Sequence, residues 1–215
     1  MTRSGQYAGF TARKEQLEYV RSTGGLRFNR NPSTFNGLQN HILSALRDRY
    51  HELPESVRRH YVRTFNCFHG CSEAVCGGGL VNLSGLEDPG FFGAGVYATL
   101  NLEYAARYAA GEFSTDPARR VPPGVEFPVV MLAACVGSAY PITPAVDYTH
   151  TNTRNRDKCN YFGETLERGY DCHVACVSAD ANWEAVNYAE SQYVEVVFVQ
   201  ETQVLPVAVF WLSRV

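Results

Sequence analysis

The spacing of hydrophobic residues changes near residue 64, which divides the chain into two parts of different texture. In the first part, Leu38, Ile42 and Leu46 recur at helical spacing, and Gly24-Gly25 interrupts the pattern. This part therefore predicts helices over residues 11–23, 33–50 and 54–61, which together form an N-terminal helical portion over residues 1–60.

In the second part, short apolar runs alternate with clusters of Gly, Pro, Asn and Asp, a pattern typical of strands joined by loops. The predicted strands cover residues 64–69, 95–98, 129–136, 171–177, 193–199 and 207–212. One short helix follows Asn101, which would cap it, and its predicted buried stripe is Leu102, Ala105, Ala106 and Ala109. Helices followed by strands without crossover helices are typical of an α+β fold. We expect one domain over residues 1–215, with two packed, mainly antiparallel sheets and an N-terminal helical layer.

Composition bounds the class of protein. The chain has 215 residues, 13 Tyr and 12 Phe, enough to bury a substantial core. Its net charge of −3 gives no overall attraction to nucleic acid. The N-terminus has no apolar signal-peptide region, and no apolar stretch is long enough to span a bilayer. We therefore expect an intracellular monomer, cytoplasmic or nuclear, with no membrane partner.

The cysteines do not form a metal-binding pattern. There are seven of them, and no CxxC pair occurs. The spacings within Cys67, Cys71 and Cys76, and between Cys172 and Cys176, match a zinc site only loosely. We expect buried, reduced thiols and no metal.

Three segments carry candidate chemistry. His69-Gly70 ends a predicted strand, and a glycine there lets a ligand approach the backbone. Tyr97 and Tyr108 lie at the two ends of a turn-and-helix segment, where their rings could hold a flat cationic ring between them. Glu195 is a single carboxylate in an apolar strand, where an unpaired charge is costly to bury. Each also has an ordinary explanation: a structural histidine, two core tyrosines, and a carboxylate that faces solvent at an edge.

Taken in order, these segments resemble the PARP-like (diphtheria-toxin-type) ADP-ribosyltransferases, a family with a His, a Tyr and a Glu on three separate strands. The resemblance runs from about residue 60 to Val215. The motifs that carry it are Phe68-His69-Gly70, Phe92-Gly93-Ala94-Gly95-Val96-Tyr97, a helix that ends in Tyr108, the strand and glycine exit over residues 129–137, Tyr170-Asp171-Cys172, and Glu195 followed by Gln203 and Pro206.

The resemblance implies a role for each site residue. Gly70 would hold the nicotinamide carboxamide by its backbone, and Tyr97 and Tyr108 would stack on the ring. His69 would hold a ribose hydroxyl. Glu195 would bind the 2′-hydroxyl of the nicotinamide ribose and stabilise an oxocarbenium-like transition state. The catalytic set would be His69, Tyr97 and Glu195, and NAD would be the substrate, with no further cofactor.

The implied activity is transfer of ADP-ribose from NAD to a macromolecule, with release of nicotinamide. A protein is favoured over nucleic acid as the acceptor, which would dock on residues 178–192 beside Trp183, Tyr188 and Glu190. Ala105 stands where the family often has a serine, which removes one hydrogen bond worth about 1 kcal/mol. Ala105 and a compact loop near residues 80–91 favour a single ADP-ribose per site. Two alternatives stay open: a catalytically silent NAD or ADP-ribose binding module, and an NAD glycohydrolase.

Overall fold

The structure, a computed structural model, describes residues 3–23, 36–48, 62, 64–71, 90–114 and 116–214. The predicted helix at 54–61, most of the loop at 80–91 and Cys76 lie outside these residues. The described strands are β1 (Thr64–Gly70), β2 (Val96–Thr99), β3 (Glu126–Cys135), β4 (Ala139–Ile142), β5 (Cys172–Val177), β6 (Tyr193–Phe198) and β7 (Val204–Ser213). The described α-helices are α1 (Arg3–Ser22), α2 (Gly37–Asp48), α5 (Leu102–Ala109) and α6 (Pro144–Asp147).

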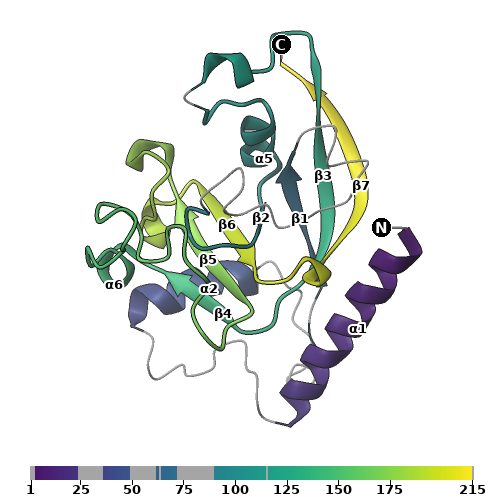
Figure 1. Ribbon diagram of the computed structural model, residues 1–215, viewed down its shortest axis with the longest axis vertical. Helices are drawn as coiled ribbons and strands as arrows, with labels where there is room; N and C mark the ends of the chain where they lie inside the picture. Colours follow the sequence, from purple (N-terminus) through teal and green to yellow (C-terminus); the bar gives the residue numbers. More distant parts are fainter. Residues whose placement is uncertain are drawn as a thin grey trace.

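The seven described strands form one sheet, in the order β4-β5-β6-β2-β1-β3-β7 (Figure 1). All neighbours are antiparallel except β4 and β5, so the expected α+β class with mainly antiparallel strands is confirmed. The expectation of two packed sheets is wrong. Phe68 on β1 pairs with Thr99 on β2, and this register pair joins the two halves into a continuous sheet. Hydrophobic patterns locate strands, but they do not identify which strands pair with one another.

The N-terminal helices cover different parts of the sheet, as Figure 1 shows. Helix α2 lies against β4 and β5, and α1 lies beside β7 and the 3-10 turn η4 (Glu201–Gln203). Ile42 and Leu46 are buried, as the helical spacing predicted, and so is Leu43. The Leu38 side chain lies outside the described part of the structure. Helix α1 begins at Arg3, well before the predicted start at residue 11. Its Arg13 guanidinium reaches Asp171 beside β5, with 2.7 Å between Nη2 and Oδ1.

All six predicted strands are present, and the differences from the prediction have local causes. Strand β4 was missed because it has only four residues and contains Pro141. Proline is tolerated there because β4 is an edge strand. Strand β7 begins at Val204, before the predicted start at residue 207.

The short helix α5 is present, and its predicted buried stripe is correct for the alanines but not for Leu102. Ala105 is buried, and Ala106 and Ala109 pack against the same core cluster. Leu102 is 38% exposed, whereas Tyr104 and Ala105 are the buried residues of the helix. The Asn101 side chain does not cap the helix, and its Oδ1 instead accepts a 3.4 Å hydrogen bond from the backbone N–H of Val194. Helix α5 thus also packs through Tyr104, a residue that the predicted stripe did not include.

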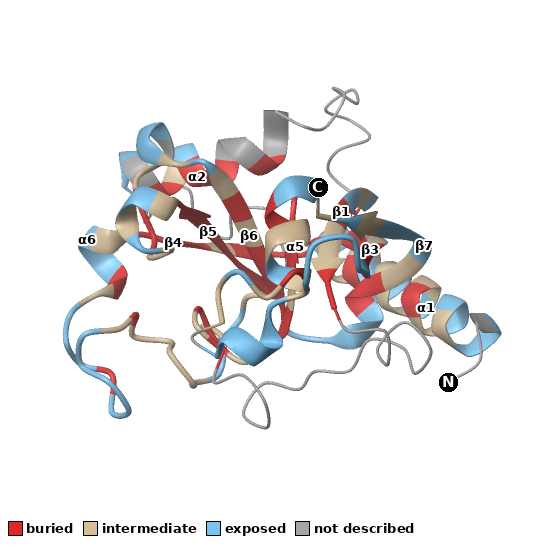
Figure 2. Cartoon of the chain, turned by 90° about the horizontal axis from the view of Figure 1, so that it is seen from above, coloured by how far each residue is buried: buried red, intermediate tan, exposed pale blue. Residues whose placement is uncertain are grey.

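Successive side chains along β6 point to opposite faces of the sheet. Val194, Val196 and Phe198 of β6 belong to the core cluster that includes α2, and Val197 belongs to a second cluster with Tyr104. Glu195 therefore lies on the face away from α2, because successive strand residues point to opposite faces. Figure 2 shows β5 and β6 as mainly buried strands.

Candidate functional site

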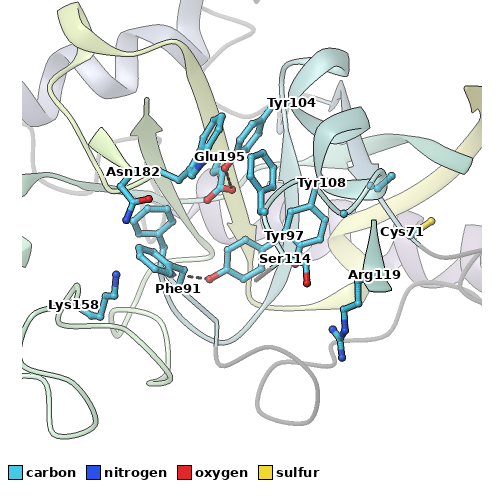
Figure 3. A pocket seen from close by; sticks show the side chains of 16 residues that line it. Cys71, Phe91, Tyr97, Tyr104, Tyr108, Ser114, Arg119, Lys158, Asn182 and Glu195 are labelled. Carbon is cyan, nitrogen blue, oxygen red and sulfur yellow. Dashed lines mark hydrogen bonds between the residues drawn. The ribbon is translucent and has the colours of Figure 1, made fainter. Parts of the chain in front are cut away.

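A cavity of about 660 Å³ lies on the face of the sheet away from α2 (Figure 3). Seven of its sixteen lining residues are aromatic. The aromatic residues among them are Phe91, Phe92, Tyr97, Tyr104, Tyr108, Phe113 and Trp183. Glu195 is its carboxylate, and Arg119 and Lys158 are its cations. Apolar walls with a few convergent polar groups are typical of a small-molecule site.

Four of the five predicted site residues line this cavity: Gly70, Tyr97, Tyr108 and Glu195. They come from β1, β2, α5 and β6, respectively. The fold therefore brings together residues that the sequence separates widely. His69 is not among the lining residues, although its neighbour Gly70 is.

The His69 side chain contacts the backbone of Tyr97. Its Nδ1 lies 2.6 Å from the Tyr97 carbonyl oxygen, which fixes the ring against β2. Burial lowers the pKa of His69, with the bond to Tyr97 acting in the opposite direction. A neutral ring with the proton on Nδ1 satisfies this geometry, because the carbonyl can only accept.

The Tyr97 side chain folds back over the glycine turn that precedes it. Its hydroxyl accepts from the Phe92 N–H at 2.7 Å and donates to the Gly93 carbonyl at 2.8 Å. Gly93 has φ +112°, a conformation that favours glycine. The hydroxyl thus closes the turn, and the ring is fixed in the cavity wall from both ends.

Gly70 is required by the packing of α5 on β1. A Cβ at this position would lie 2.2 Å from the Ala105 carbonyl oxygen and 2.9 Å from the Ala109 nitrogen. The close approach that this glycine permits in the structure is that of a helix backbone. Helix backbone fills the side that a Cβ would occupy, while Gly70 still lines the cavity.

Glu195 accepts a hydrogen bond from Tyr104, with 2.6 Å between the tyrosine hydroxyl and Oε1 (Figure 3). Burial raises the pKa of Tyr104 well above its usual value, and the charge of Glu195 raises it further. The hydroxyl therefore stays protonated and donates. Glu195 pairs in register with Thr99 of β2 and Ala175 of β5, so its backbone is held on both sides. The sequence interpretation missed Tyr104, and its place in a helical pattern gave no signal for a polar role.

Aromatic rings close the end of the cavity near Glu195. Trp183 contacts Phe113 edge to face at 4.4 Å between ring centroids, and it lies 5.3 Å from Tyr104. Asn182 and Trp183 both have left-handed backbones, with φ 53° and 64°. Such conformations are uncommon outside glycine and cluster at functional sites. In the predicted docking segment 178–192, Trp183 therefore packs into the domain and also lines the cavity, and Glu190 is exposed. The Tyr188 side chain lies outside the described part of the structure.

The two cations of the cavity lie on separate loops. Arg119 is exposed at the end of the 3-10 turn η1 (Pro117–Arg119). Lys158 pairs with Glu184 and lies over the Phe91 ring, with Nζ 4.7 Å from its centroid. Arg119 gives the rim positive charge, the charge of Lys158 is shared with Glu184, and the interior has the carboxylate of Glu195.

Two further residues of the family pattern have structural roles. Asp171 accepts from Arg13 and, through Oδ2, from the Ser138 N–H at 2.8 Å. Gln203 is fully buried, and its Nε2 donates to the Cys135 carbonyl at 3.3 Å. Both side chains connect elements at the junction between sheet and helices rather than in the cavity.

No protein-family model matches the chain, and no curated protein matches its sequence. Six cysteines in the described part are buried, as expected for thiols of this pattern. Burial raises the pKa of Cys135 and of Cys159 to about 12. Across the described ranges, no three His, Cys, Asp or Glu side chains are placed to hold a metal ion. Within the same residues, every helix is too short or too polar to cross a membrane.

Proposed function

We propose that the chain is an ADP-ribosyltransferase that cleaves NAD, releases nicotinamide and transfers ADP-ribose to a macromolecule. The observation that carries the proposal is that Gly70, Tyr97, Tyr108 and Glu195 line one cavity. The order of these residues along the sequence resembles that of the PARP-like ADP-ribosyltransferases. The cavity volume of about 660 Å³ lies within the range of about 300–1,000 Å³ that is usual for ligand pockets.

The proposed pose places nicotinamide between the rings of Tyr97 and Tyr108, with its carboxamide on the backbone of Gly70. Glu195 accepts a hydrogen bond from the 2′-hydroxyl of the nicotinamide ribose. As the bond between C1′ and the nicotinamide nitrogen breaks, the bonding pair leaves with nicotinamide and positive charge develops on the ribose. The carboxylate stabilises this charge, and the acceptor nucleophile then forms the new bond at C1′ and loses its proton.

The other polar groups support this pose without taking part in the bond changes. His69 bonds the Tyr97 carbonyl through Nδ1, and its other ring nitrogen would hold a ribose hydroxyl of NAD. Arg119 and Lys158 at the rim supply positive charge where the diphosphate of NAD would lie. NAD is consumed as substrate, and the reaction needs no second cofactor.

We also propose a fold, an oligomeric state, a compartment and an acceptor for the chain. The chain adopts the fold of the resembling family, works as an intracellular monomer, and adds a single ADP-ribose to each site on a protein acceptor. Ala105, which is buried against β1, provides no hydroxyl to the cavity and so weakens the hold on NAD.

The deciding experiment incubates the purified protein with NAD labelled in the adenylate part, with and without a cell lysate. Label on macromolecules together with free nicotinamide is the expected result. Free ADP-ribose alone would identify a glycohydrolase, and saturable NAD binding without turnover would identify a silent binding module. If the protein neither binds NAD nor turns it over, the cavity serves another ligand.

A further inference from the structure

The hydroxyl of Tyr104 donates a hydrogen bond to Glu195. Tyr104 lies on α5, 91 positions before Glu195 in the sequence, and its hydroxyl is 2.6 Å from Oε1 (Figure 3). Tyr104 also lines the cavity itself. The contact therefore belongs to the proposed site, although nothing in the family pattern assigned a role to this position.

The ring of Tyr104 is held by other rings on several sides. It stacks on Tyr193, with centroids 4.9 Å apart and an interplanar angle of 14°. Phe113 lies 5.4 Å away and Trp183 5.3 Å away. Only 5% of Tyr104 is exposed. A ring packed in this way cannot turn its hydroxyl to water, so the hydroxyl is a fixed donor.

A fixed donor restricts the carboxylate that it bonds. A glutamate side chain has three rotatable bonds, and its terminal torsion has broad, weak preferences. A hydrogen bond to an ionised acceptor is about twice as strong as one between neutral groups. The bond to Oε1 thus selects one orientation of the Glu195 carboxylate before any ligand is bound.

We propose that Tyr104 is a positioning residue of the ADP-ribosyl transfer, because its hydroxyl orients the Glu195 carboxylate toward the ribose of NAD. This inference rests on the proposed function and adds to it a residue that acts through Glu195. The donor also favours the ionised carboxylate, which is the form that stabilises a developing cation.

The test compares Tyr104→Phe with Tyr193→Phe in the full chain. Tyr104→Phe keeps the ring packing and removes the hydroxyl. Tyr193→Phe is the matched control, because its ring stacks in the same cluster but its hydroxyl bonds the exposed Glu103 at 3.0 Å. We expect Tyr104→Phe to lower kcat for NAD cleavage about ten-fold or more, with little change in KM, and to move the acidic limb of the pH–rate profile to higher pH. Tyr193→Phe should match the wild type in all three.

A second readout follows Glu195 without using activity. The titration of ¹³C-labelled glutamate side chains by NMR, with the Glu195 signal assigned from its loss in Glu195→Gln, should show a higher midpoint in Tyr104→Phe than in the wild type. If the wild type cleaves NAD and Tyr104→Phe has an unchanged kcat and midpoint, the positioning role is wrong while the proposed function stands. If the wild type neither binds nor cleaves NAD, both the positioning role and the proposed function are wrong.

Discussion

His173 on β5 holds the carbonyl of Phe92, with 2.7 Å between its Nδ1 and the oxygen. Its other nitrogen, Nε2, accepts from the Glu167 N–H, also at 2.7 Å. One imidazole thus joins the sheet to two loops, including the turn that forms the cavity wall. Both bonds require the neutral ring with its proton on Nδ1, because the carbonyl accepts and the N–H donates.

This arrangement predicts that stability falls between pH 6.5 and 4. Burial lowers the pKa of His173 to about 4, whereas an unfolded histidine titrates near 6.5. Between these pH values the unfolded chain binds a proton that the folded chain does not. The stabilisation that the neutral His173 provides is therefore fully present above pH 6.5 and is lost as pH falls toward 4, by up to about 3 kcal/mol. Urea unfolding at pH 7.5 and at pH 5 measures this change in the free energy of unfolding. His173→Asn, which keeps a donor near the Phe92 carbonyl but cannot titrate, should unfold with a weaker pH dependence, and an equal dependence would contradict the assignment.

Gly70→Ala should destabilise the protein, because the new methyl group would lie 2.2 Å from the Ala105 carbonyl oxygen. The obstacle is helix backbone, so α5 must move away from β1. We expect a loss of about 1–3 kcal/mol or more, measured by thermal unfolding. Gly37→Ala is the control, because a Cβ there has no neighbour within 4 Å. Equal melting temperatures for the two variants would show that α5 does not pack as described.

The pair between Arg13 and Asp171 should attach α1 to the sheet. Both side chains are nearly buried, with 11% and 12% exposure, and removing one partner of such a pair typically costs about 3–5 kcal/mol. Arg13→Met and Asp171→Asn should each destabilise the fold, and the double variant should lose less than the sum. Strict additivity in this double-mutant cycle would mean that the two groups do not interact.

The sequence located most strands and the carboxylate, but not the contacts between distant elements. Glu195 could be found because it interrupts an apolar strand, and alternation then placed it on the cavity face. Tyr104 could not be found, since an aromatic residue in a helix looks the same whether its hydroxyl bonds a carboxylate or not. Its partner is set by the position of α5 relative to β6, which no local pattern encodes.

The same limit explains the errors in the fold. The predicted stripe is correct for Ala105, Ala106 and Ala109, yet the helix also presents Tyr104 to the sheet and leaves Leu102 exposed. The junction between the two halves of the sheet depends on one register pair, Phe68 with Thr99, between strands that the sequence predicted separately. Local periodicity fixes the type of an element, whereas tertiary packing fixes its rotation and its neighbours.

Tyr108→Ala should weaken the binding of NAD and of benzamide together. The side chain is 47% exposed and lies in the cavity wall, so its loss should leave the fold intact. Lost stacking and burial should cost about 1–3 kcal/mol for each ligand, measured by calorimetry. Tyr19→Ala, which removes a 70% exposed tyrosine of α1, serves as the control. Unchanged affinity of Tyr108→Ala for both ligands would place the nicotinamide site elsewhere.

Glu195→Gln should retain the fold and much of the NAD binding while losing about 10²-fold or more in transfer. The amide keeps an oxygen that can accept from Tyr104, so the contact that holds the side chain survives and only the charge is removed. Glu190→Gln provides the matched control, because Glu190 is an exposed carboxylate close by in the sequence and bonds Asn187 at 3.3 Å. Single-turnover cleavage of NAD with each variant separates the chemical step from binding. If Glu190→Gln loses activity and Glu195→Gln keeps it, the carboxylate that stabilises the transition state has been misassigned.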